Sequence, residues 1–200
     1  KTNLKKSKFL KNPLTDTPVM LYNGCIFLYI MEKNMLNVGD KIPQVILPVR
    51  VGDTFEHLDT WEQFEGKRVI IFALPGAFTP TCSTYQLPGF DEKFETFHDE
   101  KGIDSIYCLS VNDSFVMNAW FESQGIVDVF PLPDGNGEFT EGMGASVQKA
   151  NLGFGIRSWR YAIVVNDNVI EHVFAEEGFG DNIDSDPYEI STPENVLNNL

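Results

Sequence analysis

The sequence predicts one α/β domain in which a mixed central sheet is flanked by helices. From residue 35 onward, short apolar segments rich in β-branched residues alternate with segments whose apolar residues recur at helical spacing. Near the end of the chain, two strand-like segments follow each other across a short turn, so we expect the sheet to include an antiparallel pair. The 200 residues, of which 42% are hydrophobic and 12% aromatic, suffice to bury the core of such a domain.

The strands are expected where apolar runs end at turn-forming residues. The clearest is residues 68–74 (RVIIFAL), whose continuous hydrophobicity is typical of a strand buried on both faces and which stops at Pro75-Gly76. A closing hairpin is expected across residues 166–168 (NDN). The other expected strands are residues 44–49 (QVILPV), 105–111 (SIYCLSV), 160–167 (RYAIVVND) and 169–174 (VIEHVF).

The helices are expected between these strands and at the end of the chain. In residues 90–101 (FDEKFETFHDEK), three Phe lie at i, i+4 and i+7, the spacing of one helix face. A second helix is expected from a cap at residues 112–114 to residue 124, with Phe115, Ala119 and Trp120 on one face. A short helix should follow the turn at residues 134–137 (DGNG), and a last one should start at residues 192–194 (TPE).

The first part of the chain differs in composition from the rest, so we interpret residues 1–34 as an N-terminal extension and residues 35–200 as the folded domain. The extension is Lys-rich, then apolar, then polar, but no small-residue cleavage site of a secretion signal follows the apolar run. We expect it to be poorly structured or absent from the mature protein, because Met31 and Met35 could each start a chain. Organellar targeting by residues 1–34 is the alternative.

The charge and the cysteine content of the sequence limit the kinds of function that we expect of the protein. Fifteen Lys and Arg against 29 Asp and Glu give a net charge of −14, which disfavours nucleic acid and anionic lipid as partners. The longest apolar run, residues 19–31, is interrupted by Asn23-Gly24 and is too short to span a membrane. Cys25, Cys82 and Cys108 form neither a paired disulfide framework nor a metal-ligand pattern. We therefore expect no bound metal and a reducing, cytoplasmic compartment.

The passage that carries chemistry is residues 74–90 (LPGAFTPTCSTYQLPGF). A buried strand ends, turn-forming residues follow, and Cys82 comes two residues after Pro80, where a helix could begin. In the first turn of a helix, unpaired backbone N–H groups and the helix dipole favour the thiolate form of a cysteine. The positions three residues away hold Thr79 and Tyr85, which excludes a CxxC disulfide oxidoreductase. The remaining pattern is Pro75-x-x-x-Thr79-x-x-Cys82, a single nucleophilic thiol.

This pattern resembles the signature of the peroxiredoxin family. Further motifs are similar to the atypical subfamily that contains the plant type-II enzymes and the bacterial enzymes fused to glutaredoxin. These motifs are PGAFTPTCS at residues 75–83, LPGF at 87–90, SVND at 110–113 with FVMNAW after it, DGNGEFTEGMG at 134–144 and GFGIRSWRYAIVV at 153–165. The resemblance covers most of residues 35–200 and implies a thioredoxin-like fold. It also implies a peroxidase for hydrogen peroxide and small organic hydroperoxides, acting in cell redox homeostasis without a bound cofactor.

The resemblance also implies roles for individual residues. Cys82 matches the peroxidatic cysteine, whose thiolate attacks the peroxide and becomes a sulfenic acid. Thr79 matches a hydroxyl that hydrogen-bonds thiolate and peroxide, and Arg160 matches an arginine that holds positive charge beside the reacting atoms. Pro75 matches a supporting residue that keeps water from the site. A homodimer is implied by resemblance alone.

The reductant follows from which cysteine resolves the sulfenic acid. Animal members of the subfamily carry a resolving cysteine after the last hairpin, but residues 175–191 contain none, which favours glutathione or glutaredoxin over thioredoxin. Plant type-II enzymes resemble this chain in a second cysteine at the position of Cys108. A disulfide between Cys82 and Cys108 is therefore the alternative, and it requires their Cα atoms to approach within about 7 Å. No glutaredoxin motif follows within the sequence, so we expect the reductant to be another molecule unless a fused domain continues beyond Leu200.

Alternative functions would use Cys82 in another way or would rest on weaker sequence motifs. A peroxide sensor or thiol-dependent binding protein would oxidise Cys82 without efficient turnover. A thiol hydrolase would need a histidine beside Cys82, but His57, His98 and His172 lie in unrelated segments. Arg157 is either a second active-site cation or a surface charge. The turn at residues 134–137 lacks the alternating acidic ligands of a calcium loop.

Overall fold

The computed structural model describes residues 8–11, 18–22, 25–28 and 34–200, and it divides the chain into two units, Lys1–Lys33 and Asn34–Leu200. In the first unit, β1 (Lys8–Lys11), β2 (Pro18–Tyr22) and β3 (Cys25–Leu28) pair antiparallel in that order. Most of residues 1–34 lie outside the described residues. The expectation that they form a poorly structured extension, or are absent from the mature protein, therefore stays a prediction.

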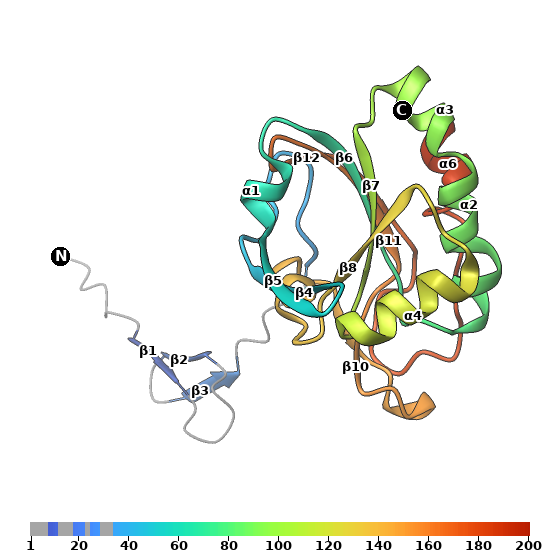
Figure 1. The fold of residues 1–200 in the computed structure, drawn as a ribbon. Coiled ribbons are helices and arrows are strands. Elements are labelled where there is room, and N and C mark those ends of the chain that lie inside the picture. Colours follow the sequence, from blue (N-terminus) through green and yellow to red (C-terminus); the bar gives the residue numbers. More distant parts are fainter. Residues whose placement is uncertain (1–7, 12–17, 23–24, 29–33) are drawn as a thin grey trace. The chain divides into compact units, whose positions relative to one another are not determined.

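A five-stranded mixed sheet forms the centre of the second unit, as the sequence predicts (Figure 1). Its order is β12-β11-β6-β7-β8, with β6, β7 and β8 parallel and β11 antiparallel to both β6 and β12. The strands are β6 (Arg68–Ala73), β7 (Ser105–Ser110), β8 (Val129–Pro133), β11 (Tyr161–Asn166) and β12 (Val169–Ala175). The sequence analysis missed β8, whose two prolines are tolerated because it is an edge strand.

Helices cover one face of this sheet, and a hairpin with two short helices covers the other (Figure 1). On the helical face lie α2 (Leu87–Glu92), α3 (Phe94–Lys101), α4 (Ser114–Gln124) and α6 (Pro193–Asn198). On the other face lie β4 (Ile46–Val51), β5 (Thr54–Asp59), α1 (Thr60–Phe64) and α5 (Glu138–Gly142). The remaining elements are the π-helix η1 (Cys82–Gln86), β9 (Ser146–Gln148), the 3-10 helix η2 (Ala150–Leu152) and β10 (Ile156–Ser158).

Two expectations about helices were wrong in detail. The expected helix over residues 90–101 is two helices, because the backbone leaves helical geometry at Lys93, with φ −102° and ψ 4°. In α4 the buried face is formed by Met117, Trp120 and Phe121, whereas Phe115 and Ala119 are exposed. Apolar spacing identified the buried Trp120 but not the position of Phe115, whose ring packs edge-to-face on Phe55 at the surface, with ring centroids 5.8 Å apart.

Alternation along the buried strands separates the core into two halves. In β6, Ile70 and Phe72 pack with the helices, whereas Val69 and Ile71 pack against the hairpin side. The helical half is built around Phe90, whose ring stacks on Phe72 at 4.2 Å and on Phe97 at 5.9 Å between centroids. This half also contains Cys82 and Cys108. The candidate chemistry therefore lies on the helical face of the sheet.

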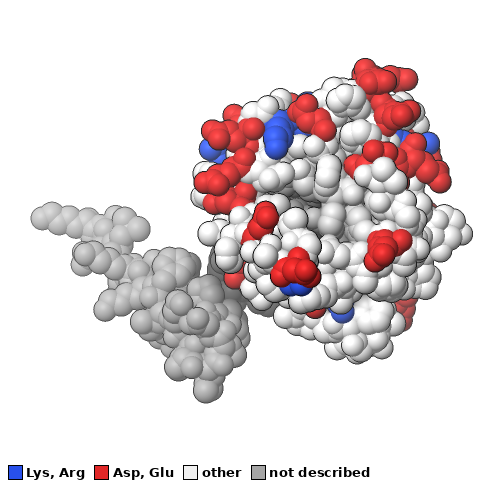
Figure 2. Space-filling view, in the orientation of Figure 1, with Lys and Arg blue, Asp and Glu red and all other residues white. Residues whose placement is uncertain are grey.

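The surface reflects the excess of acidic residues. Figure 2 shows Asp and Glu spread over the viewed face, with few Lys and Arg among them. Among the described residues, no helix is both long enough and apolar enough to cross a membrane.

We expect Phe90→Ala to lower the free energy of unfolding by about 3–5 kcal/mol, because it removes a fully buried ring and leaves a cavity between two others. Chemical denaturation measures this loss. Phe115→Ala, which truncates an exposed ring of the same size, is the matched control and should cost less than about 1 kcal/mol. Equal losses in the two variants would contradict this description of the core.

Candidate active site

The chain reaches Cys82 through a sharp turn after β6. Leu74 and Pro75 are buried at the end of the strand, and Phe78 adopts a left-handed conformation, φ 61°, that is strained for a bulky residue. Helical backbone then begins at Pro80, so Cys82 lies in the first turn, as predicted. Its side chain is fully buried.

Cys82 opens a π-helical turn, η1, that continues into α2. The backbone N–H of Leu87 donates to the carbonyl oxygen of Cys82, five residues earlier, instead of four. Such widened turns occur mostly as single insertions and frequently at functional sites. Here the turn brings the side chains of Cys82 and Gln86 to the same guanidinium group, that of Arg160.

Arg160 is the charged centre of the site. It directly precedes β11 and is 2% exposed. Its Nη1 lies 3.5 Å from Cys82 Sγ and also donates to Gln86 Oε1, and its Nη2 donates to Asp186 Oδ1 at 2.5 Å. Burial alone would lower the pKa of Arg160, but the charges of Cys82 and Asp186 outweigh it, so the pKa is raised. The guanidinium therefore stays charged beside the sulfur.

The segment after β12 supplies the outer wall of the site. Asp186 pairs with Arg160, and the ring of Tyr188 lies 5.5 Å from the guanidinium carbon. Burial raises the pKa of Tyr188, which keeps its hydroxyl protonated at neutral pH. Asp186 is the exposed member of this group, with 47% of its side chain accessible.

A buried carboxylate fixes this segment in place. Glu176 is 4% exposed and accepts hydrogen bonds from the backbone N–H groups of Glu189, Ile190 and Ser191 and from the Ser191 hydroxyl, at 2.7 to 3.2 Å. The two ends of residues 176–191 are thereby joined. This anchor holds Asp186 and Tyr188 over Arg160.

Two other predicted site residues lie in the turn that leads to Cys82. The Thr79 hydroxyl donates to the carbonyl oxygen of Gly76 at 2.8 Å, and the Thr79 carbonyl accepts from the N–H of Ser83 at 3.0 Å. The hydroxyl therefore keeps free lone pairs as an acceptor. Pro75 is buried, consistent with a supporting position.

Cys108 lies in β7, directly beside Phe72 of β6 in the sheet register. It is fully buried, and both Cys82 and Cys108 are free thiols. Burial raises the pKa of Cys108 well above its ordinary value, and the neighbouring charge of Cys82 adds to this effect. Cys108 is therefore held as a neutral thiol.

Arg157 contacts the backbone and one side chain of neighbouring loops rather than Cys82. It donates from Nε to the Phe154 carbonyl and from Nη1 to the Val111 carbonyl and Asn112 Oδ1, at 3.0 to 3.3 Å. Asn112 Oδ1 also accepts from the N–H of Ala77, so these contacts brace the turn before Thr79. Arg157 is thus a structural cation near the site.

The weaker sequence signals have structural explanations. His57 and His98 are exposed, the His172 ring stacks on Phe174, and none of the three is among the hydrogen-bonding partners of Cys82 or Arg160 in residues 34–200. In the DGNG turn, the Asp134 carboxylate accepts from the N–H groups of Phe139 and Thr140. Within the described part of the chain, no group of three or more His, Cys, Asp or Glu could hold a metal.

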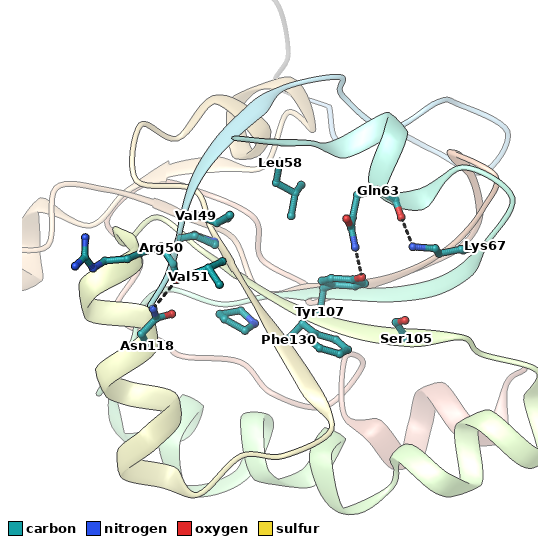
Figure 3. A pocket seen from close by; sticks show the side chains of 12 residues that line it. Val49, Arg50, Val51, Leu58, Gln63, Lys67, Ser105, Tyr107, Asn118 and Phe130 are labelled. Carbon is teal, nitrogen blue, oxygen red and sulfur yellow. Dashed lines mark hydrogen bonds between the residues drawn. The ribbon is translucent and has the colours of Figure 1, made fainter. Parts of the chain in front are cut away.

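A separate cavity of about 390 Å³ lies on the opposite side of the sheet (Figure 3). Tyr107 and Leu58, which line it, belong to the hairpin half of the core, whereas Cys82 belongs to the helical half. None of Cys82, Thr79 and Arg160 lines this cavity. It is therefore not the candidate active site.

Sequence reasoning missed Gln86, Glu176, Asp186 and Tyr188. Gln86 offers a weak signal, because it follows Cys82 by about one helical turn on an otherwise apolar face. Asp186 lies among several acids in residues 176–194, and only the fold distinguishes it from them.

Comparisons with known proteins give relatives over most of the chain. Residues 37–188 match the family model described as Redoxin. A peroxiredoxin of Rhizobium etli is 54% identical over 171 residues, which cover 81% of this chain and 95% of that protein. The hybrid peroxiredoxin hyPrx5 of Haemophilus influenzae is 48% identical over 162 residues, which cover 81% of this chain and 65% of that protein. The solved 1-Cys peroxiredoxin of Plasmodium falciparum is similar with a TM-score of 0.79 and 39% identity, over 82% of this chain and 100% of that chain.

We expect Glu176→Gln to release the segment that carries Asp186, because an amide NH₂ cannot accept the hydrogen bonds that the carboxylate accepts. Amide hydrogen exchange at residues 189–191 should become at least about tenfold faster, with a loss of about 1–3 kcal/mol in stability. Glu177→Gln, which changes the exposed neighbour, is the control. Exchange that is the same in both variants would show that Glu176 does not anchor the segment.

Proposed function

The chain belongs to the peroxiredoxin family of thiol-dependent peroxidases, and we propose that Cys82 is the nucleophile with which it reduces hydrogen peroxide and small organic hydroperoxides. The observation that carries this assignment is the contact of 3.5 Å between Cys82 Sγ and the buried, charged guanidinium of Arg160. Peroxiredoxins perform this reaction on a protein thiol and need no prosthetic cofactor.

The first step transfers one oxygen atom to sulfur. The Cys82 thiolate attacks the distal oxygen of the hydroperoxide, the O–O bond breaks, and the leaving alkoxide or hydroxide takes up a proton to give alcohol or water. Sulfur is oxidised by two electrons to the sulfenic acid while the peroxide is reduced by two.

Arg160 stabilises the charge in this step. Its Nη1 faces the sulfur, so a hydroperoxide bound against Cys82 meets a donor as negative charge develops on the leaving oxygen. Gln86 positions that nitrogen by accepting from it, and burial of the whole group strengthens the interaction because water is excluded. In this proposal, the Thr79 hydroxyl accepts a hydrogen bond from the peroxide.

We propose that glutathione, or glutaredoxin, rather than thioredoxin returns Cys82 to its reduced state. Glutathione thiolate attacks the sulfenic acid, which gives a mixed disulfide and a hydroxide that takes up the proton released by the glutathione thiol to form water, and a second thiol then displaces Cys82. Two observations support this cycle: Cys108 is held as a buried neutral thiol, and residues 175–191 contain no cysteine. The relatives include a peroxiredoxin named hybrid and one named 1-Cys.

The assembly and location belong to the same proposal. A homodimer is proposed from family resemblance together with the exposed aromatic rings of Phe55, Phe78 and Phe115, which offer apolar area for association. A cytoplasmic location is supported by the free thiols of Cys82 and Cys108, the cysteines in residues 34–200.

We expect Cys82→Ser to abolish peroxide consumption, whereas the matched variant Cys108→Ser should retain at least about half of it, because only Cys82 contacts Arg160. Peptide mass after one equivalent of hydrogen peroxide should show one added oxygen on Cys82, then a glutathione adduct when glutathione is present. A disulfide between Cys82 and Cys108 would contradict the one-cysteine cycle. Full activity in Cys82→Ser would contradict the assignment of the nucleophile.

We expect Arg160→Lys to slow the oxidation of Cys82 by roughly 100-fold, measured as a second-order rate constant with hydrogen peroxide. Lysine keeps the charge, but a single ammonium group cannot contact Cys82, Gln86 and Asp186 together as the planar guanidinium does. Arg68→Lys, which alters an ion pair with Glu171, is the control for an Arg-to-Lys change elsewhere in the sheet. A rate in Arg160→Lys that matches this control would remove Arg160 from the mechanism.

A further inference from the structure

We propose that Asp186 is a specificity-determining residue that directs this peroxidase toward uncharged hydroperoxides and against those that carry a carboxylate near the peroxide group. The inference rests on the proposed function, because it assumes that Cys82 is the reacting thiol. It concerns the choice of substrate at that site, and it depends on a residue that the sequence analysis did not single out.

Asp186 and Cys82 share one guanidinium. Arg160 donates from Nη1 to Cys82 Sγ and from Nη2 to Asp186 Oδ1, so the carboxylate and the sulfur are separated only by the width of that group. The remaining guanidinium nitrogen, Nε, is buried and has no hydrogen-bond partner in the described structure. Asp186 is therefore the exposed acceptor of this group, bound at Nη2.

Exposure decides which of these charges an incoming substrate meets. Cys82 is fully buried and Arg160 is 2% exposed, whereas 47% of the Asp186 side chain is accessible. A hydroperoxide that approaches this group from solvent encounters the negative charge of Asp186 before the positive charge of Arg160. A substrate carboxylate that approached Nη2 of Arg160 would lie beside the carboxylate of Asp186.

The position of Asp186 is fixed rather than incidental. The Glu176 carboxylate fastens the backbone of residues 189–191, and Pro187 and Tyr188 follow Asp186 directly. The Tyr188 ring lies 5.5 Å from the guanidinium carbon, which restricts the positions that Arg160 can adopt. Residues 161–200 contain no Lys or Arg, so the cation that pairs with Asp186 is Arg160, which precedes this segment.

The predicted discrimination follows from charge alone. Hydrogen peroxide and alkyl hydroperoxides are uncharged at neutral pH, so the Asp186 carboxylate does not repel them. A substrate that carries a carboxylate is repelled by the Asp186 carboxylate as it approaches Cys82, and solvent partly screens this repulsion. The repulsion corresponds to about a five- to tenfold difference in rate. Because the pair is partly exposed, this factor should decrease as salt is added.

The experiment compares two substrates of matched shape, cumene hydroperoxide and its ring para-carboxylate. The second-order rate constant for oxidation of Cys82 is measured for each on the reduced full chain, without any reductant, and their ratio cancels effects common to both. In Asp186→Asn, the ratio of the anionic to the neutral substrate should rise about five- to tenfold over wild type. Asp186→Glu, which keeps the charge, should restore the wild-type ratio.

The control is Asp184→Asn, which removes an exposed acid two residues away and changes the net charge equally. Its ratio should stay within about twofold of wild type, and the effect of Asp186→Asn should shrink at high salt. If Asp186→Asn changes both rate constants by the same factor, or matches Asp184→Asn, the inference is overturned although the peroxidase function stands. If peroxide does not oxidise Cys82 in the wild-type chain, the proposed function and this inference fail together.

Discussion

The site depends on a buried positive charge that must be neutralised by partners from distant parts of the chain. An arginine that is 2% exposed loses its hydration, and this cost is tolerable only when nearby acceptors replace the water. The acceptors of Arg160 come from η1, through Cys82 and Gln86, and from the segment after β12, through Asp186. The register of the sheet brings Arg160 close to Cys82. Tyr161 of β11 pairs with Ala73 of β6, so Arg160 lies beside the end of β6, where the turn to Cys82 begins.

The same requirement places the segment after β12 beside the candidate active site. Residues 176–191 are rich in polar residues. Glu176, at the start of this segment, accepts hydrogen bonds from the three consecutive N–H groups of residues 189–191 at its end. This buried carboxylate acts on Arg160 only indirectly, through the placement of Asp186 and Tyr188. The segment thereby becomes a wall of the candidate active site, and in our proposal Asp186 in this wall influences which hydroperoxides react.

The fold and the position of Cys82 in the candidate site can be predicted from the sequence, because both depend on patterns within short stretches of the chain. The run RVIIFAL, the turn after it and the helix-initiating context of Cys82 are all contiguous, and the motif resemblance adds Arg160. What was missed depends on tertiary contacts. The strand β8 contains two prolines that only an edge position permits, and the buried face of α4 is the one that packs with the helical half of the core. The helix break falls at Lys93, a residue type that favours helix, so the sequence does not mark it. Asp186 looks like any of its acidic neighbours until the chain folds back on Arg160.

The central claim is that Arg160, whose Nη1 lies 3.5 Å from the buried Sγ of Cys82, stabilises the charge that develops when this sulfur reacts with peroxide. The most direct measurement is the second-order rate constant for oxidation of the reduced protein by hydrogen peroxide, compared among wild type, Cys82→Ser and Arg160→Gln. The account predicts that Cys82→Ser loses the reaction and that Arg160→Gln slows it by at least about 100-fold, because a neutral amide cannot stabilise negative charge on the leaving oxygen as a guanidinium does. A rate constant in Arg160→Gln equal to that of wild type, or an unchanged reaction in Cys82→Ser, would contradict it.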